Sequence, residues 1–120
     1  MDITELERIL AEHPWLPKPR YVFMVKEKVY GAIDGIVLTY KGATPVSLRD
    51  RIALTPDADD VTVVHELLHV AGFGEVVAYT LAPLIRSIRK KVPSIIKHEV
   101  KLRKIAQPHP SIEIYELVVD

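Results

Sequence analysis

Two histidines four residues apart, with a glutamate directly after the first, are the side chains of this sequence best suited to chemistry. They form the segment His65-Glu66-Leu67-Leu68-His69. On an α-helix such histidines lie on one face, with Cβ atoms about 6 Å apart, so both can bind one zinc ion at about 2.0 Å. Glu66 is turned about 100° from His65, which places its carboxylate beside the ion. The motif predicts zinc-assisted hydrolysis in which Glu66 accepts a proton from water.

The flanking residues predict that this motif lies on a helix over residues 60–71. Glycines at 72 and 74 predict a left-handed turn after the helix. A hydrogen-bonded histidine pair without metal is the simpler alternative, but the glutamate and a candidate third ligand favour zinc. The candidates for the helix N-cap are Asp57, Asp59 and Asp60. Apolar residues recur at helical spacing and form a stripe: Val61, Val64, Leu67, Leu68 and Ala71.

Glu75, six residues after His69, is the best candidate for the third zinc ligand that a catalytic site needs. Metzincins have a third histidine or aspartate at this spacing, but they also need a downstream methionine turn. Both methionines of this chain, Met1 and Met24, lie upstream. The alternative is a ligand glutamate at the start of a second helix, and the segment after Glu75 is apolar and capable of forming a helix.

This arrangement resembles the gluzincins, and more narrowly the minigluzincins. These are short metallopeptidases of thermophilic prokaryotes, related to the catalytic domains of membrane-embedded gluzincin peptidases. The resemblance covers residues 59–81 by motif, and implies zinc ligation by His65, His69 and Glu75, Glu66 as the catalytic base, and latency through the C-terminal segment. Many gluzincins carry an aspartate four residues after the ligand glutamate. Tyr79 stands there, as a weaker contact to a ligand histidine or as a core aromatic.

Composition narrows the class of protein. The chain has 120 residues, 48% of them hydrophobic and 27% charged, which fits one domain. Its formal charge is zero, so no overall field favours nucleic acid, and the lack of cysteine removes disulfides and thiolate ligands. No signal peptide and no apolar run of about 18 residues is visible, which predicts a cytoplasmic protein without a transmembrane segment. Nine prolines and no asparagine indicate a thermophilic source.

The remaining pattern predicts an α+β fold, a minimal zincin-like domain with a small three-stranded sheet. We expect an N-terminal helix over residues 3–12, strands over 21–25, 29–40 and 51–55, and a glutamate helix that Pro83 kinks or restarts. A C-terminal helix over residues 94–106 and an extended tail follow. The whole chain is one metallopeptidase domain, with a catalytic core of residues 1–106 and a tail of residues 107–120.

The tail and the basic segment before it each allow two interpretations. Residues 111–120 alternate like a strand and carry three acidic side chains, so they could lie in the active site and inhibit it, or form an ordinary last strand. Eight of the sixteen basic residues fall between Arg86 and Lys104. A solvated helix face is favoured there over a surface for membrane or nucleic acid.

The predicted activity is zinc-dependent hydrolysis of a peptide or protein. An extended substrate would be held by main-chain hydrogen bonds to a strand edge, over residues 51–55 or 36–40. His98, Tyr79 and Tyr115 are candidate donors to the oxyanion, whereas His13 and His109 precede prolines and have no assigned role. A non-catalytic zinc-binding or scaffold protein and a non-peptidase hydrolase are the alternatives. A zinc site closed by protein in its fourth position would favour the scaffold.

Overall fold

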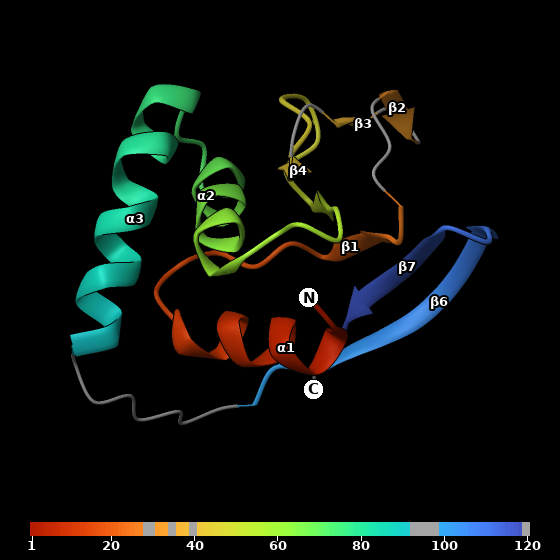
Figure 1. Cartoon of the computed structure of the whole chain (residues 1–120), viewed down its shortest axis with the longest axis horizontal. Helices are drawn as coiled ribbons and strands as arrows, with labels where there is room; N and C mark the ends of the chain where they lie inside the picture. Colours follow the sequence, from red (N-terminus) through yellow and green to blue (C-terminus); the bar gives the residue numbers. More distant parts are fainter. Residues whose placement is uncertain (28–30, 34–35, 39–40, 92–98, 119–120) are drawn as a thin grey trace.

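The structure is a computed structural model that describes residues 1–27, 31–33, 36–38, 41–91 and 99–118. Three helices lie within these residues: α1 (Ile3–Glu12), α2 (Asp60–Val70) and α3 (Glu75–Lys91). The strands are β1 (Tyr21–Val25), β2 (Gly31–Ile33), β3 (Ile36–Leu38), β4 (Gly42–Ala43), β5 (Arg51–Leu54), β6 (Leu102–His109) and β7 (Ile112–Leu117). Figure 1 shows α2 beside α3, α1 below them, and the β6–β7 hairpin reaching away from the helices.

The main sheet has five strands in the order β4-β5-β1-β7-β6, so the prediction of a three-stranded sheet is wrong. β1 pairs with β5 in parallel and with β7 antiparallel, and the other two pairings are antiparallel. β2 and β3 form a separate antiparallel pair within the region expected to be one strand. The broader expectation of an α+β fold is confirmed.

The C-terminal helix predicted over residues 94–106 is also wrong where the structure describes it. Residues 94–98 lie outside the described part, and β6 begins at Leu102. Arg103 stands directly opposite Glu116 on β7 and pairs with it at 3.1 Å, while Lys104 reaches Glu113 at 3.0 Å. These partners across the strands, invisible to local helix propensity, favour the extended conformation.

The predicted tail enters the sheet as an inner strand. β7 lies between β1 and β6, and the boundary predicted between residues 106 and 107 falls inside β6. Ile112 and Ile114 pack with Phe23 and Val25 on one face of the sheet. This position matches the ordinary last strand considered for the tail, and an inhibitory role stays a prediction.

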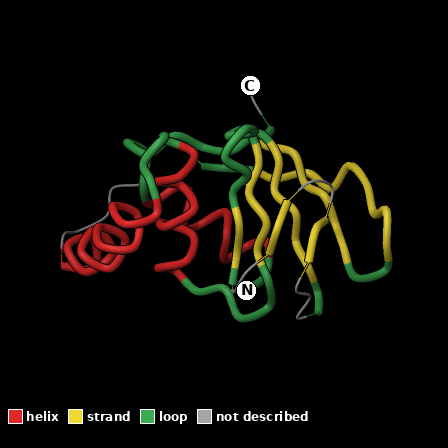
Figure 2. The backbone as a smooth tube through the Cα atoms, turned by 90° about the horizontal axis from the view of Figure 1, so that it is seen from above, coloured by secondary structure: helices red, strands yellow, loops and turns green. Residues whose placement is uncertain are grey.

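The helices cover one face of the sheet, and the main core lies between them (Figure 2). In the apolar stripe predicted for α2, Val64, Leu67 and Leu68 are confirmed as buried, but Ala71 is exposed. Val63, which was not part of the predicted stripe, is fully buried. The core joins α1, the sheet and α2 through Leu6, Ile9, Leu10, Val22, Ile52, Leu54, Val63, Val64, Leu67 and Leu68. α2 is therefore fixed against α1 and the sheet by buried apolar contacts.

α3 packs against α2 through residues spaced four apart. Ala78 and Ala82 are fully buried and small, which lets the two helix backbones approach closely. Arg86, one turn further, bridges Glu12 of α1 at 2.5 Å and Asp60 of α2 at 2.6 Å. Pro83 does not restart the helix, since α3 runs through it. Proline has no N–H for the carbonyl of Tyr79, four residues earlier, but both residues lie on the exposed side, where water can reach that carbonyl.

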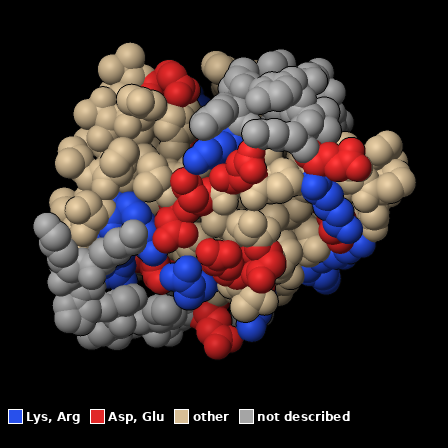
Figure 3. Space-filling model, in the orientation of Figure 1, with Lys and Arg blue, Asp and Glu red and all other residues tan. Residues whose placement is uncertain are grey.

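On the face shown in Figure 3, side chains of both charges are present, with acidic side chains grouped over α1 and the start of α2. None of the helices described is long and apolar enough to cross a membrane.

Candidate metal centre

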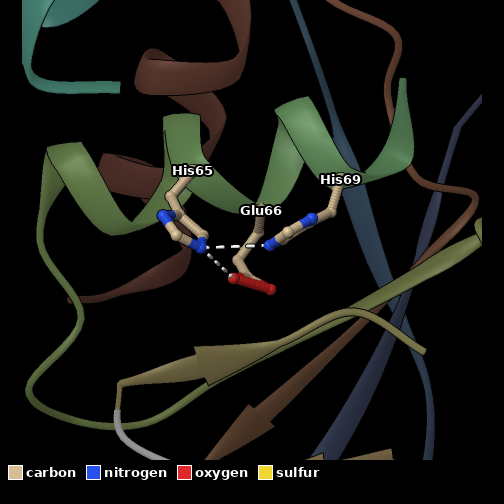
Figure 4. Close-up of side chains that lie close together, drawn as sticks. All are labelled: His65, Glu66 and His69. Atoms are coloured by element: carbon tan, nitrogen blue, oxygen red, sulfur yellow. Dashed lines mark hydrogen bonds and ion pairs between the residues drawn. The ribbon is translucent and has the colours of Figure 1, made fainter. Parts of the chain in front are cut away.

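α2 presents the histidine motif because its two ends are fixed by hydrogen bonds. The Asp59 carboxylate accepts hydrogen bonds from the Thr62 backbone N–H at 2.9 Å and from the Thr62 hydroxyl at 2.8 Å, which caps the N-terminus. Figure 4 shows His65, Glu66 and His69 projecting from the same side of the helix toward one point. Ligand atoms of these three residues all lie within 4.8 Å of one another.

The two imidazoles meet at their Nε2 atoms, which are 3.1 Å apart. Burial lowers the pKa of His65, which favours the neutral imidazole that a metal ligand requires. Both side chains are largely shielded, with 18% of His65 and 17% of His69 exposed. The pair therefore supplies two convergent nitrogen donors at the edge of the core.

Glu75, the first residue of α3, brings its carboxylate to both histidines. Its Oε1 lies 3.0 Å from His65 Nε2, and its Oε2 lies 2.9 Å from His69 Nε2. A tetrahedral zinc ion about 2.0 Å from each donor requires donor separations of roughly 3.3 Å, since a tetrahedron's edge is about 1.6 times its centre-to-corner length. The observed separations are close to this value, so His65, His69 and Glu75 fit a zinc ion.

Glu66 is placed as a neighbour of the donor set rather than a member of it. Its Oε1 is 3.9 Å from His65 Nε2, farther than either Glu75 oxygen from its histidine. The side chain is 5% exposed, and its Oε2 accepts a hydrogen bond from the Thr44 hydroxyl at 2.8 Å. Burial raises the pKa of Glu66 to about 7, and the Thr44 hydrogen bond opposes that rise. Such a carboxylate can exchange protons near neutral pH.

The turn after α2 orients His69. Gly72 has φ of 102°, its N–H donates to the His69 carbonyl at 2.9 Å, and the Phe73 N–H donates to the Leu68 carbonyl at 3.0 Å. This is a Schellman ending with glycine in the left-handed conformation, as the sequence predicted. It brings the Phe73 carbonyl to 2.9 Å from His69 Nδ1. The proton on Nδ1 is thereby held by Phe73, which leaves the Nε2 lone pair for a metal.

The donor set opens into a cavity of about 850 Å³ between α2, the start of α3 and the segment from Lys41 to Val46. β4 lies at the edge of the five-stranded sheet, where it borders this cavity. A Cβ on Gly42 would lie 2.9 Å from the Ala53 carbonyl oxygen and 3.4 Å from Glu66 Cγ. Glycine at this position therefore lets the edge strand approach Glu66.

Of the two substrate edges considered from the sequence, the structure excludes the one over residues 51–54. β5 lies between β4 and β1, so residues 51–54 have no free edge. β3 belongs to the separate two-stranded sheet, and residues 39–40 lie outside the described part. The prediction of residues 51–55 is wrong because β4, only two residues long, carries too weak a pattern to be recognised in the sequence.

The other predicted side chains fall in different places. Tyr79 lines the cavity and is 74% exposed, whereas Tyr115 donates to Glu113 at 3.3 Å and does not line it. His98 is outside the described residues. The Tyr79 contact considered for a ligand histidine has no counterpart among the described hydrogen bonds, where the Phe73 carbonyl meets His69 instead. His13 is fully buried, which its position before a proline did not reveal.

Sequence reasoning missed Thr44, Gly42 and the Phe73 carbonyl. Thr44 is 22 residues from Glu66 in sequence, so no local spacing connects the two. The turn at Gly72 was visible in the sequence. Which side chain the Phe73 carbonyl meets depends on the direction in which the chain leaves the helix, and this was not visible.

Comparisons of the chain with models of known protein families, with curated proteins and with solved structures found no match. The assignment of the site depends on its residues and their geometry.

Proposed function

We propose that the chain is a small gluzincin-type metallopeptidase that hydrolyses peptide bonds with zinc. The observation that carries this proposal is the convergence of His65, His69 and Glu75 at 2.9 to 3.1 Å, with a buried carboxylate beside them. A zinc ion in such a site supplies a Lewis acid that activates water and polarises the scissile carbonyl.

The protein's own contribution to the reaction is proton transfer by Glu66. Its carboxylate, buried and held by Thr44, accepts a proton from the attacking water and delivers it to the leaving nitrogen. His65 and His69 hold their Nε2 atoms toward the site. The Phe73 carbonyl keeps the His69 ring in this orientation.

An extended peptide fits this proposal along β4. The strand is the last of its sheet and borders the cavity, so a substrate can add to its edge through main-chain hydrogen bonds. Gly42 keeps this edge close to Glu66. The cytoplasmic location, the thermophilic source and latency through the C-terminal segment remain predictions from the sequence.

Zinc content and peptide hydrolysis test the proposal together. The purified protein should hold about one zinc per chain, and Glu75→Ala should lower that occupancy. Glu66→Gln should retain zinc and fold but lose about 10²–10⁴-fold in hydrolysis. Full occupancy in Glu75→Ala would remove Glu75 from the ligands. Zinc binding without hydrolysis of any peptide by the wild type would support the non-catalytic zinc protein instead.

A further inference from the structure

Arg49 stands on the cavity wall at the C-terminal end of α2. A Cβ on Gly72 would lie 2.6 Å from its Nη1 atom, so the guanidinium rests directly against the backbone of the turn that orients His69. The residue is exposed, and no hydrogen bond or ion pair connects it to any residue that the structure describes. Its guanidinium is therefore available to a ligand in the cavity that holds the zinc donors.

When the charges that line the cavity are paired with one another, no acidic side chain is left to balance the positive charge of Arg49. At the N-terminal end of α2, Lys41 pairs with Asp59 at 3.1 Å. A zinc ion would be neutralised by the carboxylates of Glu75 and Glu66, since both histidines bind it as neutral rings. Arg49 is the cation left over at the opposite end of α2. With zinc bound, the cavity would thus carry its excess positive charge beside the Gly72 turn.

We propose that Arg49 is a specificity-determining residue that binds a carboxylate of the peptide substrate. This carboxylate is either an acidic side chain or the C-terminus, and the inference rests on the proposed peptidase function. A guanidinium offers a planar pair of N–H donors that match a carboxylate in two parallel hydrogen bonds. Arg49 is set apart from the zinc donors by the turn at Gly72, so it contacts the substrate away from the scissile bond.

Stabilisation of α2 is the other role open to Arg49, because a cation near a helix C-terminus interacts favourably with the helix dipole. That role needs no particular substrate and would affect stability alone. The two roles are separated by binding measurements with peptides that differ only in one carboxylate.

The test measures peptide binding in the zinc-loaded Glu66→Gln background, so that no turnover is needed. One series carries a single Glu or Gln at each position in turn with an amidated C-terminus, and a second compares a free C-terminus with its amide. We expect one Glu position, or the free C-terminus, to bind about 10- to 100-fold more tightly than its neutral counterpart. Arg49→Gln should abolish this preference, and Arg49→Glu should transfer it to a Lys peptide.

Lys41→Gln is the matched control, because it removes the other cation of the cavity and should keep the preference. Equal affinity for acidic and neutral peptides, loss of the preference in Lys41→Gln alone, or no binding of any peptide would each overturn the inference. The proposed function fails differently, through absence of zinc or of hydrolysis in the wild-type protein. When zinc binds but hydrolysis is absent, a preference that depends on Arg49 can still be measured, because the test needs binding alone.

Discussion

The Thr44 hydroxyl donates a hydrogen bond to the Glu66 carboxylate at 2.8 Å, and it joins the end of an edge strand to the base of the candidate site. Glu66 is buried, so a single hydrogen bond to its charged form has a large effect on its protonation. The bond also ties the strand at which a substrate would bind to the group that would act on it.

For the proposed function, Thr44→Val should therefore impair hydrolysis mainly at acidic pH. Burial raises the pKa of Glu66 to about 7 and Thr44 opposes the rise, so removing the hydroxyl should raise the pKa further. The base would then be protonated over a wider range, and the acid limb of kcat/KM should move to higher pH. We expect about tenfold lower kcat/KM below roughly pH 6. Thr80→Val is the control, since among the described residues its hydroxyl donates to the Val76 carbonyl, within its own helix. Equal profiles for the two variants would contradict the role of Thr44.

The turn after α2 provides a second test, through two neighbouring glycines. Gly72→Ala would place a side chain at φ of 102° and 2.6 Å from Arg49, and both effects should displace the Phe73 carbonyl from His69. We expect zinc affinity to fall about 10- to 100-fold, as for loss of other partners of metal-binding histidines. Gly74→Ala meets open space and should bind zinc like the wild type. Zinc affinity is measured by competition with a chelator. Equal affinity in the two variants would show that the turn at Gly72 does not contribute to zinc binding.

These relationships show which parts of the molecule the sequence could predict. The residues of the candidate metal site lie within eleven positions on two helices. Helical spacing and the turn signal at Gly72 were therefore enough to predict that His65, His69 and Glu75 lie together. Helix α1 was equally local, with a regular apolar stripe and Asp2 as its N-cap. Thr44 and Arg49 come from the segment around a two-residue strand, whose position depends on pairing with β5. Strand alternation was recognised in the residues that form β7, but β6 was predicted as a helix. Its ion pairs join residues of two strands, and no single segment contains them.

The ion triad of Arg86 with Glu12 and Asp60 should contribute strongly to stability. Burial would raise the pKa of Glu12, but hydrogen bonds from Arg86 and Arg8 hold it below its usual value. Arg86→Met would leave two shielded carboxylates with less compensation, and should lower the free energy of unfolding by about 2–4 kcal/mol. Arg103→Met removes an arginine that is 66% exposed and should cost less than about 1 kcal/mol. Urea unfolding of both variants measures the difference, and similar losses would contradict the importance of burial.

His13 should make the fold less stable in mild acid. The side chain is fully buried, neither ring nitrogen has a partner within the described structure, and burial lowers its pKa to about 4. An unfolded histidine titrates near pH 6.5, so between about pH 6.5 and 4 the unfolded state binds a proton that the folded state does not. Stability should fall by about 1–3 kcal/mol as the pH decreases through this window.

His13→Phe should reduce this pH dependence, because phenylalanine cannot take up the proton in the unfolded state. Chemical unfolding at neutral pH and near pH 4.5 measures the effect, with the exposed His109→Phe as control. If the difference in unfolding free energy between the two pH values is the same in His13→Phe as in the wild type, the acid sensitivity arises elsewhere.

Truncation after Ala106 should unfold the protein rather than activate it. The change removes β7, which pairs with β1 along its whole length, and the end of β6. It also removes Ile112 and Ile114 from the cluster with Phe23 and Val25, and Tyr115 from contact with the main core. We expect loss of the far-ultraviolet circular dichroism signal and of zinc binding. A truncation after Val118 keeps both strands and should remain folded. The prediction that the C-terminal segment inhibits the enzyme would gain support only from a protein truncated after Ala106 that stays folded, holds zinc and cleaves peptides faster than the full chain.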